Sequence, residues 1–180
     1  AMGRILPELT NKVTGSTTAC FEPALDYVVV KVPRWDLERF SGVDARIGSQ
    51  MKSVGEVMAV GRRFEEALQK ALRMIGTGMR GLVRNDLVFE DLRRELSEPT
   101  HRRVFAIAQA FEQGFALEEI EALTDIDPWF LHRISAVVKI EMELASSGGA
   151  PGPELLSRAK KAGFSDLQIA GIRGMEASEV

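Results

Sequence analysis

The chain has 180 residues, of which 45% are hydrophobic and 27% are charged, and its formal net charge is −3. This size and apolar content are sufficient for a folded core, so the composition excludes a disordered chain. The slightly acidic balance excludes a general basic surface for nucleic acid, and the lack of any run of about 18 apolar residues predicts no membrane span.

The first part of the chain has a mixed pattern. Apolar residues at helical spacing predict a short helix over 6–13, which the glycine- and threonine-rich stretch 15–18 ends. The β-branched run 27–32 predicts a strand closed by Pro33. Because both faces of this run are apolar, we expect the strand to be covered on both sides.

The polar stretch 35–50 predicts a loop with one helical turn near Asp36, and 54–60 predicts a second strand. The apolar period then changes to that of a helix, which we place over 62–75. Gly76 stands where a helix typically ends.

Three glycines within 76–88 predict a linker, and we place a domain boundary there. Residues 1–75 are then one unit and residues 76–180 another. The expected fold is mainly α, with a small α+β segment of two strands and a helix followed by an all-helical domain.

The second unit is a series of predicted helices. One begins at Phe89, one begins at Thr100 as its cap and ends at Gly114, and a short one covers 117–124.

Asp127 as cap and Pro128 in the first helical position give a specific start signal for the next helix. A flexible joint at 146–152 and short helices over 153–162 and 165–173 follow. The core-facing positions predicted for the helix after Pro128 are Phe130, Ile134, Val137, Val138 and Leu144.

The helical unit contains a faint repeat. Gly-Phe pairs at 114–115 and 163–164 each follow a predicted helix, and an isoleucine lies five positions after each phenylalanine, at Ile120 and Ile169. We interpret the repeat as two helix-turn-helix hairpins, each of which needs the other to bury its apolar stripe.

Charged residues flank and interrupt the two predicted strands. They require partners, because an unpaired charge in an apolar strand is costly. Two readings stay open: cross-strand ion pairs, or a polar surface that faces a missing part of a larger domain. The residues are Glu22, Asp26, Lys31, Arg34, Lys52 and Glu56.

The residues that usually carry chemistry give no site. The sequence has no glycine-rich phosphate loop, and His101 and His132, predicted on helix surfaces, lack a second ligand at metal-binding spacing. Cys20 is the single cysteine, predicted to be half-buried, and it indicates a reducing compartment, which we take to be the cytoplasm. The acidic residues Glu118, Glu119 and Glu121 predict a solvated helix face.

Five aromatic residues are candidates for an association surface, because the predicted helices cannot bury all of them inside. Trp129 is the strongest single candidate, since it stands beside another aromatic residue at a helix start. The alternative for each is the core of the helical unit. The five are Phe105, Phe111, Phe115, Trp129 and Phe130.

Residues 163–170 resemble the turn and second helix of DNA-binding helix-turn-helix units. Only Gln168 and Arg173 could contact base edges there, and the surrounding sequence is acidic. A free-standing helical adaptor or DNA-binding module is therefore the alternative function.

One stretch, FEPALDYVVVKVPR at 21–34, resembles the segment that closes the first ATP-grasp domain of the carbamoyl-phosphate synthase large chain. Residues 50–62 resemble the next block of that domain, and residues 67–73 the helix that leads out of it. Residues 125–131 and 162–166 resemble blocks of the family's oligomerization domain, although Pro128 stands where family members often carry arginine.

The resemblance implies a fragment of an enzyme with two tandem ATP-grasp halves. The first half forms carboxyphosphate from bicarbonate and ATP, ammonia from a glutaminase subunit or domain gives carbamate, and the second half phosphorylates carbamate, for arginine or pyrimidine biosynthesis. ATP with Mg or Mn, and K, are implied for the intact enzyme.

No residue of this chain matches the family's nucleotide or metal ligands. We therefore assign no catalytic, cofactor-binding or metal-binding residue, and we expect a non-catalytic piece that joins the halves and mediates subunit association. The expected partners are the rest of the large chain, the glutaminase and further copies of the protein, with no nucleic acid and no membrane.

Overall fold

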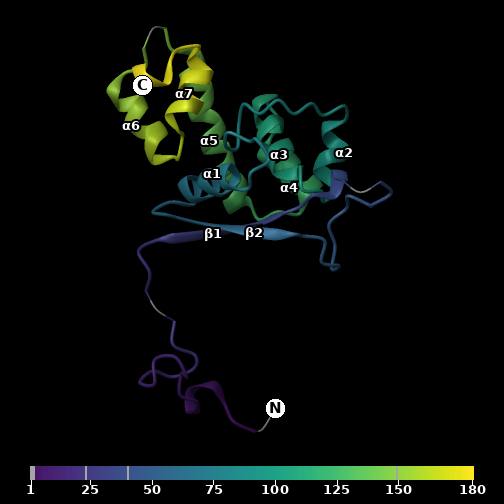
Figure 1. The fold of residues 1–180 in the computed structure, drawn as a ribbon, viewed down its shortest axis with the longest axis vertical. Coiled ribbons are helices and arrows are strands. Elements are labelled where there is room, and N and C mark those ends of the chain that lie inside the picture. Colours follow the sequence, from purple (N-terminus) through teal and green to yellow (C-terminus); the bar gives the residue numbers. More distant parts are fainter. Residues whose placement is uncertain (1–2, 23, 40, 149) are drawn as a thin grey trace.

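The computed structural model describes residues 3–22, 24–39, 41–148 and 150–180. A two-stranded sheet and the helix that covers it are followed by a group of helices, which confirms the predicted mainly α fold class with its small α+β segment (Figure 1). None of the helices in the described ranges has the length and apolar character needed to cross a membrane.

The elements in chain order are η1 Leu6–Glu8, β1 Val28–Arg34, η2 Leu37–Arg39, β2 Gly55–Gly61, α1 Phe64–Met74, α2 Leu92–Ser97, α3 Arg103–Glu112, α4 Leu117–Thr124, α5 Pro128–Ser146, α6 Pro153–Lys161, α7 Asp166–Arg173 and η3 Ala177–Glu179.

The helix predicted over 6–13 is wrong, because only the short 3-10 turn η1 forms there. The carboxamide oxygen of Asn11 accepts a hydrogen bond from the backbone N–H of Val13 at 2.8 Å, and such a local bond competes with helix formation. The segment turns back on itself through a bridge between Thr10 and Thr18 and lies away from the body of the protein (Figure 1).

Strands β1 and β2 are antiparallel, with Val28 opposite Gly61 and Arg34 opposite Gly55. β1 passes through Pro33 instead of ending there, which is possible because each strand of a two-stranded sheet has a free edge. One sheet face packs on α1, where Ala59 is buried.

The opposite face of the sheet is exposed in the described residues, so the expectation of cover on both sides is wrong for β1. Val29 and Val60 lie opposite each other on this face, and they are 44% and 48% exposed. Met58, in the same row, is 60% exposed.

Helix α1 confirms the predicted helix, and Gly76 follows it with a φ of 76°, as its predicted stop requires. The carboxylate of Glu66 accepts a hydrogen bond from the backbone N–H of Arg62 at 2.9 Å, which satisfies one of the open donors before the helix. Its buried residues are Ala67, Leu68, Gln69, Ala71 and Leu72.

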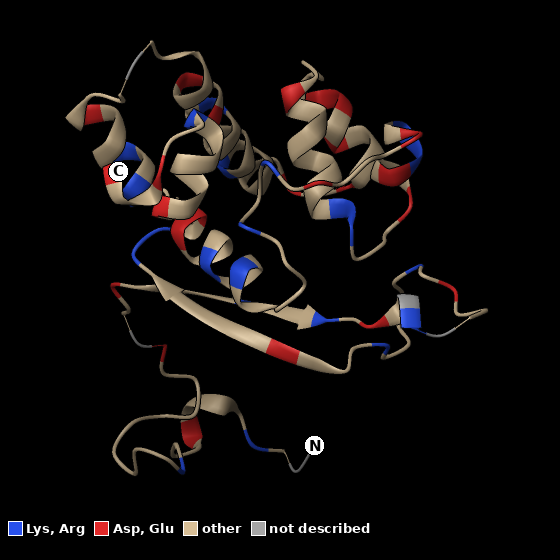
Figure 2. Cartoon of the chain, turned by 45° about the horizontal axis from the view of Figure 1, so that its top comes forward, with Lys and Arg blue, Asp and Glu red and all other residues tan. Residues whose placement is uncertain are grey.

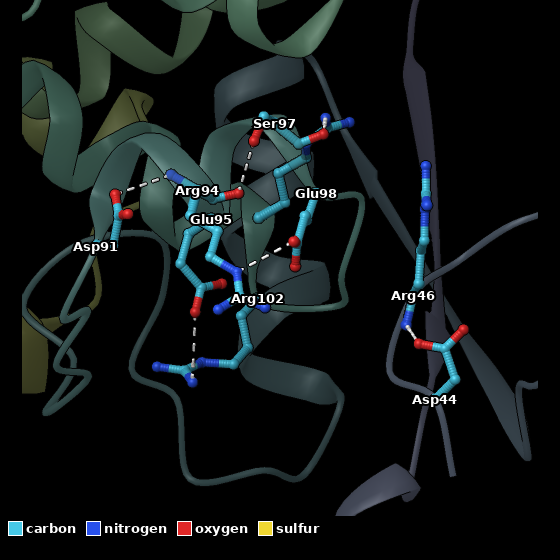
Figure 3. A network of polar contacts seen from close by, with 9 residues as sticks. Asp44, Arg46, Asp91, Arg94, Glu95, Ser97, Glu98 and Arg102 are labelled. Carbon is cyan, nitrogen blue, oxygen red and sulfur yellow. Dashed lines mark hydrogen bonds and ion pairs between the residues drawn. The ribbon is translucent and has the colours of Figure 1, made fainter.

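Helices α2 and α3 begin later than predicted because of local side-chain caps. The Asp91 carboxylate accepts from the backbone N–H of Arg94 at 3.0 Å, so α2 starts after Asp91 and not at Phe89 (Figure 3). The Thr100 hydroxyl accepts from the N–H of Arg102 at 3.3 Å, which makes a separate turn before α3.

Helix α5 is the centre of the helical part. Asp127 caps it by accepting from the backbone N–H of Trp129 at 2.8 Å, and Pro128 is its first residue, as predicted. Leu131 occupies the core position expected for Phe130, which is 42% exposed. Helices α1, α3, α4, α6 and α7 all pack on α5.

The two predicted hairpins are present as α3–α4 and α6–α7. Gly114 and Gly163 have φ angles of 85° and 89°, and the residue after each donates its N–H to a carbonyl of the preceding helix at 3.0 Å. Ile120 and Ile169 are fully buried. The expectation that each hairpin buries the other's stripe is wrong, since both hairpins pack on α5.

The segment between α1 and α2 is irregular but packed against the core. Leu82 and Val83 are 1% and 2% exposed. The backbone N–H of Leu82 donates to the side-chain oxygen of Gln69 at 3.3 Å, and the same oxygen accepts from the Gln168 amide at 3.1 Å. A buried glutamine pair therefore connects α1, this segment and α7.

The turn between α6 and α7 is in close contact with α1. A Cβ at Gly163 would lie 2.8 Å from the Cα of Glu66, whereas a Cβ at Gly114 would meet nothing within 4 Å. The two glycines have similar φ angles, so an alanine at either position has a similar cost in backbone strain. Only the alanine at position 163 would also meet neighbouring atoms, so comparing the two variants isolates the steric contribution.

We expect Gly114→Ala to lower the free energy of unfolding by about 1–2 kcal/mol, the cost of the left-handed conformation. Gly163→Ala adds overpacking against α1, so it should cost about 1–3 kcal/mol more. Urea unfolding of both variants measures the difference. Equal losses would contradict the close packing of α1 on the α6–α7 turn.

Candidate association surface

The open face of the sheet is the first candidate for contact with another polypeptide. Its apolar row consists of Val29, Met58 and Val60, and we call it the open sheet face. The Lys31 ammonium and the Glu56 carboxylate form a diagonal cross-strand ion pair at 2.8 Å beside this row. Figure 2 shows most charged stretches on the helices and loops and few on the strands.

Some of the charged residues around the strands have the ion-pair partners that the sequence predicted. Cross-strand pairing is confirmed for Lys31 and Glu56. The Lys52 ammonium instead donates to the Asp44 and Arg46 carbonyls of the loop before β2, at 2.9 and 2.7 Å. These charged residues therefore stabilise local structure, and in the described residues nothing covers the open sheet face.

The second candidate is a cluster of three rings, Phe64, Trp129 and Phe130, which we call the aromatic corner. The ring centroids are 5.0–5.4 Å apart in edge-to-face arrangements. The Arg133 guanidinium lies over the Trp129 ring at 5.0 Å and pairs with Glu65 at 3.5 Å.

The corner forms because two helices start at the same place. Leu131 turns into the core, so the preceding residues Trp129 and Phe130 lie at the surface of the first turn of α5, 47% and 42% exposed. Phe64, the first residue of α1, fills the space beside them. An exposed aromatic cluster of this kind is typical of protein interfaces.

The other three predicted interface residues do not join the corner. Phe105, Phe111 and Phe115 are partly buried and pack against the core, and the Arg93 guanidinium lies 5.2 Å from the Phe115 ring centre. Phe64 packs partly against the core, as its helical spacing predicted, but no pattern in the sequence indicated its contact with the other two rings.

A cavity of about 560 Å³ between α3, α5 and the 76–91 segment contains an acidic pair. Glu141 is 2% exposed, and its carboxylate accepts a 2.5 Å hydrogen bond from the Arg84 guanidinium. The backbone of Arg84 has a positive φ of 56°, which is uncommon for a residue other than glycine. Glu112 lines the same cavity. Partial desolvation at the cavity wall, and then the charge of Glu141, raises the pKa of Glu112 above its ordinary 4.5, against the effect of Arg84, while the residue stays open to solvent on its other side.

Residues with typical catalytic side chains do not converge. Within the described residues no group of three or more His, Cys, Asp or Glu could hold a metal ion. His132 is exposed as predicted, but His101 lies in the turn before α3, with its ring 6.3 Å from that of Trp35. Cys20 is exposed, which corrects the expectation of a half-buried thiol and follows from its place in the N-terminal segment outside the core.

The acidic residues Glu118, Glu119 and Glu121 belong to α4, and the Glu119 carboxylate pairs with Arg93.

The residues proposed for DNA contact have structural roles instead. Gln168 is 1% exposed, in the glutamine pair described above. The Arg173 guanidinium donates to the Leu144 carbonyl at 2.8 Å and so holds α7 on α5. Neither side chain points outward to read a base edge.

Comparison with known proteins gives a family match over residues 56–180, to the family described as carbamoyl-phosphate synthetase large chain, oligomerisation domain. The chain is 51% identical over its full length to the arginine-specific carbamoyl phosphate synthase large chain, mitochondrial, of Schizosaccharomyces pombe, and it covers 16% of that protein.

Two further relatives are similarly close. Ammonia carbamoyl-phosphate synthase, mitochondrial, of Homo sapiens is 50% identical over 97% of this chain, and the multifunctional protein pyr1-3 of Dictyostelium discoideum is 46% identical over 94%. The chain spans 12% and 8% of these two proteins.

The acidic pair gives a pH prediction. The raised pKa means that the folded state holds the Glu112 proton more tightly than the unfolded state, so stability falls as the pH rises from 4.5 through the folded-state pKa. Glu112→Gln should therefore be more stable than the unsubstituted chain at neutral pH, and the difference should shrink below pH 4.5. Urea unfolding at both pH values measures this, with Glu118→Gln, outside the cavity lining, as control; a destabilised Glu112→Gln at neutral pH would contradict it.

Proposed function

Because the chain belongs to the carbamoyl-phosphate synthetase large-chain family, with the oligomerisation domain over residues 56–180, we propose that it is a non-catalytic joining and association element of a longer large chain. The observation that carries this proposal is a pair of exposed apolar surfaces, the open sheet face and the aromatic corner, on a body with a well-packed core.

The parent protein would make carbamoyl phosphate from bicarbonate, ammonia and ATP. The names of the relatives and the sequence blocks at 21–34 and 50–62 support this activity. Its partners would be the remainder of the large chain, a glutaminase subunit or domain and further copies of itself. ATP, its divalent metal and K would bind to the remainder of the parent.

Two units divide the proposed roles. Residues 1–75 would be the end of the first ATP-grasp domain, and residues 76–180 the helical association unit, although the family match already begins at residue 56. A two-stranded sheet is rarely stable in water without further cover, and here α1 covers only one of its faces. We infer that the remainder of the parent domain packs on the open sheet face.

A single exposed cysteine, Cys20, suits a reducing compartment. We place the parent in the cytoplasm on this ground. Two of the relatives are named as mitochondrial, so cell fractionation would decide between the cytoplasm and the mitochondrion.

Whether the parent covers the open sheet face can be tested by comparing the effect of one substitution on the stability of the 180-residue chain and of the full-length parent. Val60→Asp should change the stability of the 180-residue chain by no more than about 0.5 kcal/mol, because Val60 is 48% exposed there. In the full-length parent the carboxylate would be buried, and the loss should be several-fold larger. Val88→Asp, in an 80% exposed position, is the control. An equally small loss of stability from Val60→Asp in both proteins would show that the parent does not cover the open sheet face, and it would refute the proposed packing.

Association through the aromatic corner predicts a change in sedimentation. Trp129→Ala combined with Phe130→Ala should raise the dissociation constant of the self-associated chain at least about tenfold. Leu167→Ala, which removes a 70% exposed side chain from α7, is the matched control. An unchanged sedimentation profile for the double variant, with a dimer present, would show that the corner does not mediate association.

A further inference from the structure

A second cavity, of about 550 Å³, lies where the end of β1, helix α1 and the start of α3 meet. Its volume is in the range of small-molecule binding sites. Its walls come from segments far apart in the sequence, and it is separate in its lining from the open sheet face and the aromatic corner.

The inner walls of this cavity are apolar. Leu68 and Leu72 of α1, which are 7% and 2% exposed, form one side. Val104 and Phe105 of α3 form the other. A ligand that enters would place an apolar body between the two helices.

Cationic side chains surround the rim of the cavity. The guanidinium groups of Arg34 and Arg39 share one carboxylate, that of Asp36, at 3.4 and 3.7 Å. Both distances exceed the 2.7–2.9 Å typical of a charged hydrogen bond. The described contacts of these two guanidinium groups are therefore long, which leaves both groups able to turn toward a bound anion.

Other rim residues are fixed in place by contacts of their own. The Arg102 guanidinium donates to the Val88 carbonyl at 2.9 Å, and it pairs with Glu95 at 3.8 Å, the contact drawn in Figure 3. The Arg34 guanidinium lies beside Gly76, where a Cβ would be in ordinary van der Waals contact with it at 3.5 Å. Among the arginines in the described lining of the cavity, Arg34 and Arg39 are therefore the two with only long contacts.

We propose that this cavity binds a small amphipathic carboxylate, with its aromatic or branched apolar body between α1 and α3 and its carboxylate on Arg34 and Arg39. A guanidinium group matches a carboxylate in a two-bond geometry. An anion at the rim would replace the long contacts to Asp36 with shorter ones. The site is independent of the association surfaces proposed above.

The probe for the test is 1-naphthylacetate, titrated into the 180-residue chain and followed by amide chemical shifts in two-dimensional NMR. We expect a dissociation constant of roughly 1 mM or tighter. The shifts should centre on Leu72 and Phe105, and the neutral analogue 1-naphthylacetamide should bind at least about tenfold more weakly.

Arg39→Gln should weaken binding of the probe roughly tenfold, as expected for loss of a charged hydrogen bond. Its side chain is 73% exposed, so the substitution leaves the core unchanged. Arg63→Gln, at another exposed arginine, should have no effect. Binding that is insensitive to Arg39→Gln, equal binding of the amide, or shifts centred elsewhere would overturn the proposal.

The same titration with the full-length parent separates a ligand from a covering segment. Binding of 1-naphthylacetate to the parent with a similar constant supports a small-molecule site. Binding to the 180-residue chain alone would mean that another part of the parent fills the cavity, and this outcome would overturn the proposal.

Discussion

The structure depends on helix α1 being packed on two sides at once. One side covers the sheet, and the other meets α5 and the turn between α6 and α7. Gln69, fully buried in this contact, donates to the Ala162 carbonyl at 3.0 Å while its oxygen accepts from Gln168. A buried amide stabilises only in a geometry that satisfies its donors and acceptors, so this contact fixes the sheet and the C-terminal hairpin relative to each other.

Helix α5 has the complementary role within the helical part. The two hairpins have matching turns at Gly114 and Gly163, yet both pack on α5, which supplies their apolar cover. The sequence repeat describes the local turn, which a glycine in the left-handed region and a buried isoleucine specify. The repeat does not reveal which helix each hairpin packs on. That helix is α5, which lies between the two copies in the chain and is not part of either.

Most elements could be predicted where the signal was local. Asp127 with Pro128 fixed the start of α5, and the period of apolar residues located α1. Predictions failed where a tertiary contact or a side-chain cap decided: Asn11 replaced the expected helix with a turn, and Leu131 took the core position expected for Phe130. The aromatic corner was only half predictable, because Phe64 reaches it through packing between distant segments.

Strand β1 also bears on the behaviour of the protein during synthesis. A flat apolar strand with free N–H groups is a template for intermolecular β-aggregation. Pro33 removes one donor from the β1 edge, and the charged Lys31 interrupts its apolar row. A nascent chain that carries these two residues would resist fibril growth before α1 has packed on its sheet.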